Sequence, residues 1–340
     1  MNSQQHDERF LQLKDWLTNK LDIKDAAIVL ASGDASFRRY FRVNFRDMSY
    51  IAMDAPPEKE DCKPFVAVAR AFAALGLHVP EVLAEDHEQG FLLLSDLGDQ
   101  QYLDYLDEIS VEGMYKDAMT ALLTLQKKGR QESYTLPPYD HALLWREMEL
   151  FRDWFLREHL GVDTAALKDV LDTVFELLAQ SSLEQPQVWV HRDYHSRNLM
   201  RTSQNNPGVL DFQDAVFGAV TYDLASLLRD CYIAWPINKV EQWVEDYRLR
   251  LQKEGVIDDV PQDVFLKWFD LMGAQRHLKA IGIFARLNHR DGKSGYLGDI
   301  PRTLSYVQQV AGKYPQLKPL QDIINNHVLP QLDLHSGQKK

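Results

Sequence analysis

The chain has 340 residues, of which 45% are hydrophobic and 26% charged, as in a globular protein with one large or two modest domains. Its 50 acidic and 38 basic residues give a net charge of −12. This balance argues against a general nucleic-acid or membrane-surface binder, because such proteins carry basic surfaces. It leaves room for a local basic pocket that binds phosphates.

The cysteine content and the N-terminus bear on the compartment. Cys62 and Cys231 lie far apart without metal-type spacing, which predicts packing residues in a reducing compartment rather than a disulfide framework. The N-terminal MNSQQHDERF has no apolar core of the kind a secretory signal needs, and no apolar run approaches the length of a membrane span. We therefore expect a cytoplasmic protein with no membrane or nucleic-acid partner, and a monomer.

The first 95 residues are predicted to be rich in strands. An amphipathic first helix is indicated by apolar residues at helical spacing, namely Phe10, Leu13, Trp16, Leu17 and Leu21. Strands are expected near 28–31, 37–45, 50–54, 81–85 and 90–95. Residues 64–75 predict a helix that ends at Gly76.

A turn of small residues, Ser32-Gly33-Asp34-Ala35-Ser36, separates the first two predicted strands. Small side chains let backbone N–H groups approach phosphate oxygens, so Ser32, Gly33 and Ser36 are candidates for nucleotide binding. An ordinary β-hairpin turn would have the same composition. The two interpretations stand side by side.

Beyond about residue 100 the composition becomes helical. Helices are expected near 101–107, 111–128, 141–159, 164–181, 220–233, 238–253, 261–288, 301–312 and 316–328. The shift predicts two domains, an N-terminal lobe at 1–95 and a C-terminal lobe at 96–335. The expected fold class is α+β, with a small β-rich lobe and a larger helical lobe.

One polar stretch, His191 to Asp211, interrupts the helical part. A predicted strand at 188–190 leads into a loop, and short extended segments follow at Leu199-Met200 and 208–210. This layout is expected to bring Asp193, Asn198 and Asp211 close together. Two carboxylates and an amide oxygen are hard ligands that suit Mg²⁺ better than zinc.

The loop His191-Arg192-Asp193-Tyr194-His195-Ser196-Arg197-Asn198 fits the kinase catalytic-loop pattern H-R-D-x-x-x-x-N, and Asp211-Phe212 follows where protein kinases have Asp-Phe-Gly. Phosphoryl transfer needs a carboxylate that orients the attacking hydroxyl and a metal that neutralises charge. Asp193 is therefore the expected catalytic base, and Asn198 and Asp211 are the expected Mg²⁺ ligands beside ATP.

Other polar residues of this stretch have more than one interpretation. His191 either contacts substrate or fixes the loop by a hydrogen bond, and we favour the structural role. His195, Arg197 and Asp214 are assigned to substrate contact. Arg192, His195 and Arg197 are equally compatible with solvated loop charges.

The stretch resembles the aminoglycoside phosphotransferase family in Tyr194-His195, in Asp211-Phe212-Gln213-Asp214-Ala215 with Gly218, and in Tyr222-Asp223-Leu224-Ala225. The resemblance covers residues 25–310. It implies a two-lobed, protein-kinase-like fold and ATP-dependent, Mg²⁺-dependent phosphorylation of a small-molecule hydroxyl. By the same resemblance Asp223 is structural and is expected to cap the helix that it opens.

The small lobe departs from the kinase pattern. Met53 stands near the position of the third-strand lysine that binds the ATP phosphates, and the following helix has no glutamate to pair with such a lysine. Another cation is then expected at the phosphates, and Arg38, Arg39 and Arg42 are the nearest candidates. Alternation puts Arg38 and Arg42 on one strand face and Arg39 on the other. Main-chain groups of Ser95 to Leu97, between the lobes, are expected to hold adenine.

Further runs resemble one branch of the family, namely residues 53–57, 95–99, 275–287, 291–293, 296–297 and 300–302. That resemblance implies ATP-dependent phosphorylation of the anomeric hydroxyl of N-acetylmuramate or N-acetylglucosamine to a 1-phosphate, in bacterial cell-wall recycling. Arg276, Lys279 and Arg286 are spaced to share one helix face, and Arg276 and Lys279 are assigned to substrate binding, for example to a lactyl carboxylate.

Three alternatives stay open. The run at 275–287 also reads as an ordinary core helix with charges on one face. The protein could act on another small molecule, as aminoglycoside, choline or homoserine kinases do. It could also be a catalytically weak nucleotide-binding protein, because the third-strand lysine is missing.

Overall fold

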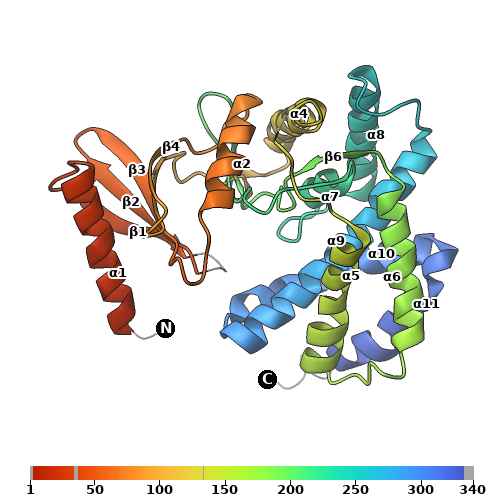
Figure 1. Cartoon of the computed structure of the whole chain (residues 1–340). Helices are drawn as coiled ribbons and strands as arrows, with labels where there is room; N and C mark the ends of the chain where they lie inside the picture. The colour runs from red at the N-terminus through yellow and green to blue at the C-terminus, as the bar shows by residue number, and fades with distance from the viewer. Residues whose placement is uncertain (1–2, 34–36, 133, 333–340) are drawn as a thin grey trace. The chain divides into compact units, whose positions relative to one another are not determined.

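The computed structural model describes residues 3–33, 37–132 and 134–332, and its chain divides into two compact units (Figure 1). The first unit comprises Met1–Gln101 and Leu199–Asp214, and the second comprises Tyr102–Asn198 and Ala215–Lys340. Within the described ranges no helix is long and apolar enough to cross a membrane. Cys62 and Cys231 are both buried and free, one in each unit.

The first unit is built on a five-stranded antiparallel sheet in the order β1-β2-β3-β5-β4. Its strands are β1 (Ala27–Gly33), β2 (Arg39–Phe45), β3 (Met48–Asp54), β4 (Val82–Asp86) and β5 (Phe91–Ser95). All five strands predicted from the sequence are confirmed. Ser32 and Gly33 still belong to β1, where they pair with Tyr40 and Arg39.

One face of this sheet is covered by α1 (Ser3–Asp15) and the π-helical turn η1 (Trp16–Lys20), which lie beside the strands in Figure 1. The apolar residues that repeat at helical spacing pack here, as Leu13, Trp16 and Leu17 meet Phe41 and Val43 of β2. The predicted first helix is confirmed.

A second helix of this unit, α2 (Lys63–Ala74), carries a proline in its first turn and is followed by Gly76 with φ +89°. Its buried Phe65 and Phe72 lie 4.9 and 5.7 Å, ring to ring, from Phe212. The residue after Asp211 is therefore anchored in the apolar interior of the first unit.

The short hairpin of β7 (Leu199–Met200) and β8 (Gly208–Val209) also belongs to the first unit. The Arg201 N–H donates to Gln100 O at 2.7 Å, and the Val209 N–H donates to His78 O at 2.7 Å. These bonds explain why the segment after the catalytic loop joins the N-terminal part of the chain. The division into domains at 1–95 and 96–335 stays a prediction.

The second unit is helical apart from one small sheet. Its helices are α3 (Tyr102–Tyr105), α4 (Val111–Gly129), α5 (His141–Leu150) with η2 (Phe151–His159), α6 (Lys168–Leu183), α7 (Tyr222–Leu228), α8 (Ile237–Lys253), α9 (Gln262–Asp291), η3 (Ser294–Asp299), α10 (Ile300–Lys313), η4 (Pro315–Leu317), α11 (Lys318–Ile323) and η5 (Ile324–Val328). They confirm the predicted helices.

The 30-residue α9 runs through this unit and contacts α5, η2, α6, α7 and α10 (Figure 1). Gly282 lets it approach closely, because a Cβ there would lie 2.3 Å from the carbonyl carbon of Leu150. The small sheet pairs β6 (Gln187–Val190) with β9 (Val216–Ala219). β9 was not predicted from the sequence. Together, β6, β9 and α7 frame the loop that follows β6.

Candidate functional site

The loop His191–Asn198 leaves β6 and is held from α7. Both oxygens of the fully buried Asp223 carboxylate accept backbone N–H groups, from His191 at 2.7 Å and from Arg192 at 3.0 Å. The expectation that Asp223 caps its own helix is wrong, because the N-cap of α7 is Thr221 and the carboxylate is used by the loop. Burial raises the pKa of Asp223 to about 7, although the two N–H groups act in the opposite direction.

His191 is fully buried at the start of the loop. Its Nδ1 accepts the Asp193 N–H at 3.2 Å, and its ring meets Tyr194 edge to face at 5.6 Å. A histidine that bonds the backbone of the next functional residue fixes the loop conformation. This geometry supports the structural interpretation of His191.

Asp193 and Asn198 are brought together by a compact turn. The Asn198 side-chain amide donates to Asp193 O at 2.9 Å, and the His195 N–H donates to the same oxygen at 3.1 Å. The Ser196 N–H donates to the buried Asp230 carboxylate at 2.8 Å. The Asn198 side chain is therefore held against the backbone of Asp193 within one hydrogen-bonded loop.

Arg192 has a left-handed backbone, φ +77°, which non-glycine residues rarely adopt and which costs about 1–3 kcal/mol. The surrounding contacts must hold it in place. Its N–H is bonded to Asp223, and its guanidinium forms an ion pair with Glu147 of α5. Arg192 is therefore a partly buried anchor of the loop, tied through its ion pair to α5.

Glu147 also binds Lys279, one of the expected substrate residues. The Lys279 ammonium lies 3.2 Å from Glu147 Oε1 and donates to Tyr222 Oη at 3.2 Å, while Tyr139 Oη donates to the other Glu147 oxygen. Lys279 therefore belongs to an ion network that includes Arg192 of the loop, because both cations bind Glu147. No motif pointed to Glu147, but an acid among the apolar positions of a helix was a usable signal.

The charges around Asp193 determine its ionisation. Burial raises the pKa of Asp193, but the nearby cations Lys279, Arg192 and Arg276 and the His195 ring outweigh burial and lower it to about 2. The carboxylate is therefore ionised at neutral pH and ready to accept a hydrogen bond from a hydroxyl group.

The remaining substrate candidates of the second unit gather near Tyr232. The His195 ring lies 5.3 Å from the Tyr232 ring, and burial lowers the pKa of His195. The Arg197 guanidinium stacks over Tyr232 at 3.7 Å, and the buried Arg276 donates to Cys231 Sγ at 3.7 Å. Segment 231–232 is therefore contacted by all three substrate candidates, His195, Arg197 and Arg276.

Asp211 belongs to the first unit and has a left-handed backbone, φ +63°. Gln213, at the position of the kinase glycine, donates to Asp211 Oδ1 at 2.8 Å. Phe212 is fully buried and fixes the segment, whereas Asp214 is exposed. Strained backbone at Arg192 and at Asp211 marks both ends of the motif.

The residues of the first unit that are expected to bind the nucleotide lie in several different segments. Ser95 Oγ accepts the Glu81 N–H at 2.8 Å, and Leu97 lies against Gly208. Arg38 directly precedes β2 and is partly buried. Ser36 lies outside the described residues, and of Ser32 and Gly33 only the backbone is described.

Met53 and the arginines of β2 show how the first unit differs from a kinase with a third-strand lysine. Met53 is fully buried. The Arg42 guanidinium donates to both oxygens of Asp96, at 2.7 and 3.2 Å, so this arginine is tied to the segment after β5. Arg39 forms an ion pair with the buried Asp54 at 2.5 Å. The geometry does not favour Arg42 as a phosphate ligand.

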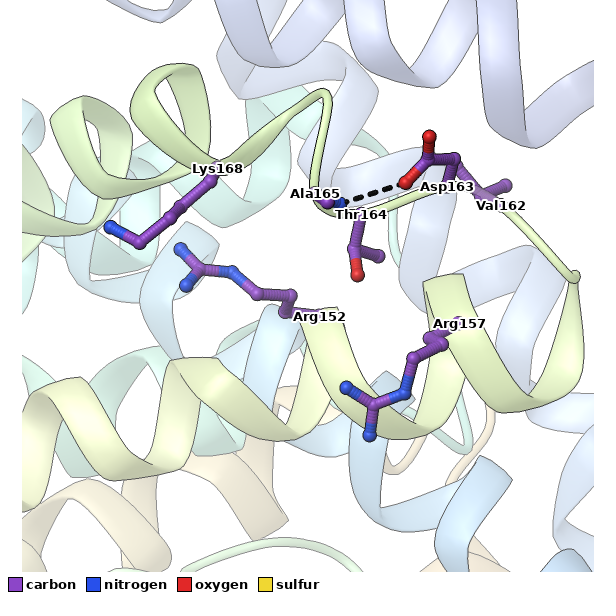
Figure 2. Close-up of a pocket in the computed structure, with 7 residues that line it drawn as sticks. All are labelled: Arg152, Arg157, Val162, Asp163, Thr164, Ala165 and Lys168. Carbon is purple, nitrogen blue, oxygen red and sulfur yellow. Dashed lines mark hydrogen bonds between the residues drawn. The ribbon is translucent and has the colours of Figure 1, made fainter.

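A basic pocket elsewhere in the second unit was not predicted (Figure 2). The side chains of Arg152 and Lys168 point into it, and Arg157 lies at its other end. Each of these cations has a carboxylate partner: Arg152 and Lys168 share Asp172, and Arg157 lies 2.7 Å from Asp153. The positive charges are therefore compensated, and we assign no ligand to this pocket.

The β-rich first unit, the helical second unit and the H-R-D-x-x-x-x-N loop define a kinase-like phosphotransferase. The chain belongs to the phosphotransferase enzyme family, whose model matches residues 27–258. The family resemblance inferred from the sequence, the α+β kinase-like fold class and the assignment as an enzyme are thereby confirmed.

Among its relatives is an N-acetylmuramate/N-acetylglucosamine kinase of Pseudomonas putida, 46% identical over 331 residues that cover 94% of this chain and 97% of the relative. A protein of the same name from Pseudomonas aeruginosa is 46% identical and covers 96% and 98% of the two chains. The ADP-bound crystal structure of aminoglycoside phosphotransferase APH(2'')-Ib has a similar fold, with a TM-score of 0.58, 15% identity and 88% and 98% coverage.

Proposed function

We propose that the protein transfers the γ-phosphoryl group of ATP to the anomeric hydroxyl of N-acetylmuramate or N-acetylglucosamine. The observation that carries this proposal is the 46% identity, over nearly the whole chain, to relatives named as kinases of these two sugars. The catalytic loop supports it, because the residues expected for such a reaction are present and hydrogen bonds of Asn198 and of the His191 N–H hold the loop.

Asp193 would accept the hydrogen bond of the sugar hydroxyl. Because its pKa is about 2, it is a weak base, and its main effect is to orient the oxygen toward the phosphorus. An anomeric hydroxyl suits such a residue, since the ring oxygen withdraws charge and makes this hydroxyl more acidic than an ordinary alcohol. Asp223 and Glu147 would keep the loop in place through the backbone and side chain of Arg192.

Asn198 and Asp211 would hold Mg²⁺. An amide oxygen and a carboxylate are hard donors, and magnesium sites commonly combine one or two such ligands with nucleotide phosphates. The donor set therefore fits the ion. When bound, Mg²⁺ supplies positive charge to the phosphoryl group that is transferred. Gln213 would orient the Asp211 carboxylate through its 2.8 Å hydrogen bond.

ATP is the expected phosphoryl donor, and the related fold of the aminoglycoside phosphotransferase was crystallised with ADP. Main-chain groups of Ser95 to Leu97 would hold adenine. The small residues Ser32, Gly33 and Ser36 would lie near the phosphates, with Arg38 as the cation. A cytoplasmic location, a monomeric state and a role in cell-wall recycling stay predictions.

The test is an assay of the purified protein with Mg-ATP and each free sugar, in which ³¹P NMR identifies the product. We expect an anomeric phosphate, whose phosphorus couples to the C1 proton. The Asp193→Ala variant is the matched control, and its kcat should fall by about 10²- to 10⁴-fold while ATP binding persists.

Three results would overturn the proposal. A 6-phosphate product would remove the anomeric assignment. Turnover of an aminoglycoside, choline or homoserine, with none of either sugar, would assign the protein to another branch of its family. Nucleotide binding without turnover of any acceptor would leave a non-catalytic binding protein.

A further inference from the structure

Three arginines of the second unit converge on segment Cys231–Tyr232, each from a different element. Arg276 of α9 donates to Cys231 Sγ at 3.7 Å, and Arg302 of α10 donates to Cys231 O at 2.9 Å. Arg197 of the catalytic loop stacks over the Tyr232 ring at 3.7 Å. The chain thus concentrates positive charge directly beside the loop that carries Asp193.

Asp193 and Asp230 attract the Arg276 charge from a distance, but no carboxylate of a described residue forms a direct ion pair with it. Asp230 accepts backbone N–H groups of Ser196 at 2.8 Å and of Tyr232 at 2.9 Å, and Asp299 lies 3.3 Å from Arg302. Among the residues that the structure describes, no carboxylate oxygen lies within 4 Å of the Arg276 guanidinium, and its Nε has no hydrogen-bond partner.

The lack of a direct ion pair sets Arg276 apart from the other buried cations. Four lysine or arginine side chains are less than a tenth exposed in the described part of the chain, and Arg276 is one of them at 5%. The other three have carboxylate partners: Arg229 pairs with Asp270, Arg248 with Glu245 and Lys279 with Glu147. A buried guanidinium with no carboxylate in direct contact has N–H groups left to satisfy, so such a site is suited to an anion that arrives with a ligand.

The position of Arg276 indicates which ligand this is. Arg276 lies one helical turn before Lys279 and is close enough to Asp193 to help lower the pKa of that carboxylate. Arg197 and Tyr232 are only partly buried, so a ligand can approach from their side. An acceptor whose hydroxyl lies at Asp193 would therefore reach Arg276 with another of its groups.

We propose that Arg276, together with Arg197, binds a carboxylate of the sugar substrate and so sets the preference for an acidic amino sugar. The inference rests on the proposed function. The two sugars in the names of the relatives differ in this respect, because muramate carries a lactyl ether with a carboxylate where glucosamine has a hydroxyl. A planar guanidinium suits a carboxylate, since two parallel N–H groups can bind its two oxygens.

The experiment compares kcat/KM for N-acetylmuramate and N-acetylglucosamine in the wild type and in Arg276→Gln. Loss of a charge-assisted hydrogen bond lowers binding by about 10- to 100-fold, so the muramate value should fall at least tenfold further than the glucosamine value, mainly through KM. Arg276→Lys keeps the charge and should restore part of the ratio. Arg157→Gln, which removes an exposed arginine paired with Asp153, should leave the ratio unchanged.

An equal loss on both sugars, carried by kcat, would overturn the proposal, because it would indicate that Arg276 meets the transferred phosphoryl group or only supports the fold. An unchanged ratio would overturn it as well. A wild type that phosphorylates neither sugar would instead refute the proposed function on which the inference rests.

A second measurement uses only the wild type and so does not depend on the folding of a variant. The methyl ester of N-acetylmuramate has the same size to within one methyl group but lacks the negative charge. We expect its KM to exceed that of the free acid by about tenfold or more. Equal KM values for ester and acid would show that no cation recognises this group.

Discussion

The buried carboxylate of Glu147 allows a sharp test of how the catalytic loop is held. Glu147 is 5% exposed and meets three groups: the guanidinium of Arg192, the ammonium of Lys279 at 3.2 Å, and the Tyr139 hydroxyl. In Glu147→Gln the shape is kept and the charge removed. The buried Lys279 and the partly buried Arg192 then lose the anion that they share.

The magnitude follows from this loss. Removing one partner of a buried ion pair costs about 3–5 kcal/mol, because the other partner stays buried without compensation. For a unit of this size each kcal/mol lowers the melting temperature by about 2–4 °C, so we expect a decrease of about 6–20 °C. Asp153→Asn is the matched control, since its partner Arg157 is half exposed, and it should cost less than about 1 kcal/mol.

The pH dependence has a definite sign. Burial raises the pKa of Glu147, but Lys279 and Arg192 outweigh burial and hold it below 4.5, its ordinary value. The stability that this carboxylate contributes is therefore present above the unfolded-state value and is lost as the pH falls through the lower folded-state value. The difference in unfolding free energy between wild type and Glu147→Gln should shrink in the same acid range.

The assay is urea denaturation followed by circular dichroism, on Glu147→Gln, Lys279→Met and the double variant. Lys279→Met removes one of the cations that Glu147→Gln leaves uncompensated. The double variant should therefore be more stable than the sum of the single effects predicts, by about 1 kcal/mol or more. Additivity to within about 0.5 kcal/mol would refute the claim that Glu147 and Lys279 form a coupled buried pair.

Three further predictions concern the carboxylates of the site. Asp211→Ala should weaken Mg-ATP binding in calorimetry, and binding of wild-type strength would remove Asp211 from the metal site. Asp223→Asn should leave one of the two loop N–H groups unsatisfied and cost about 1–3 kcal/mol of stability. Because the pKa of Asp223 is raised to about 7 in the folded protein, the stability of the wild type should fall as the pH rises from about 4 to about 7, and the variant should show no such slope. Because the pKa of Asp193 is about 2, kcat should show no acid limb from this residue above about pH 3, and a limb near pH 5 that disappears in Asp193→Asn would contradict this.

The elements of the fold were largely predictable because their signals are local. Helical spacing at Leu13, Trp16 and Leu17 reflects burial of one helix face, and the apolar run at 91–94 reflects burial of both faces of a strand, as the structure confirms. The catalytic loop was predictable for a similar reason, since its roles depend on residue types at fixed spacing within one turn. β9 was missed because its four residues are too few for a periodic signal.

What the sequence could not supply is the choice of partners across the chain. Asp223 resembled a helix cap, but it bonds a backbone 31–32 residues earlier. Lys279 stays a predicted substrate residue, but its ion pair with Glu147 of another helix could not be read from the sequence. Both partners were unpredictable for one physical reason. A charged side chain on an internal helix has several possible partners that the sequence does not distinguish, and tertiary packing decides which one it meets.

The same dependence on ion-pair partners explains why β3 can lack a lysine at Met53. A lysine at Met53 would be a fully buried cation, and α2 offers no glutamate to pair with it. The ion pairs of the sheet are arranged differently, since Arg39 is bound by Asp54 and Arg42 by Asp96. Both arginines lie on β2, and the pair of Arg42 with Asp96 ties this strand to the segment that is expected to bind adenine. Arg39 and Arg42 therefore hold the sheet together, and no described cation takes the place of the lysine at Met53 itself.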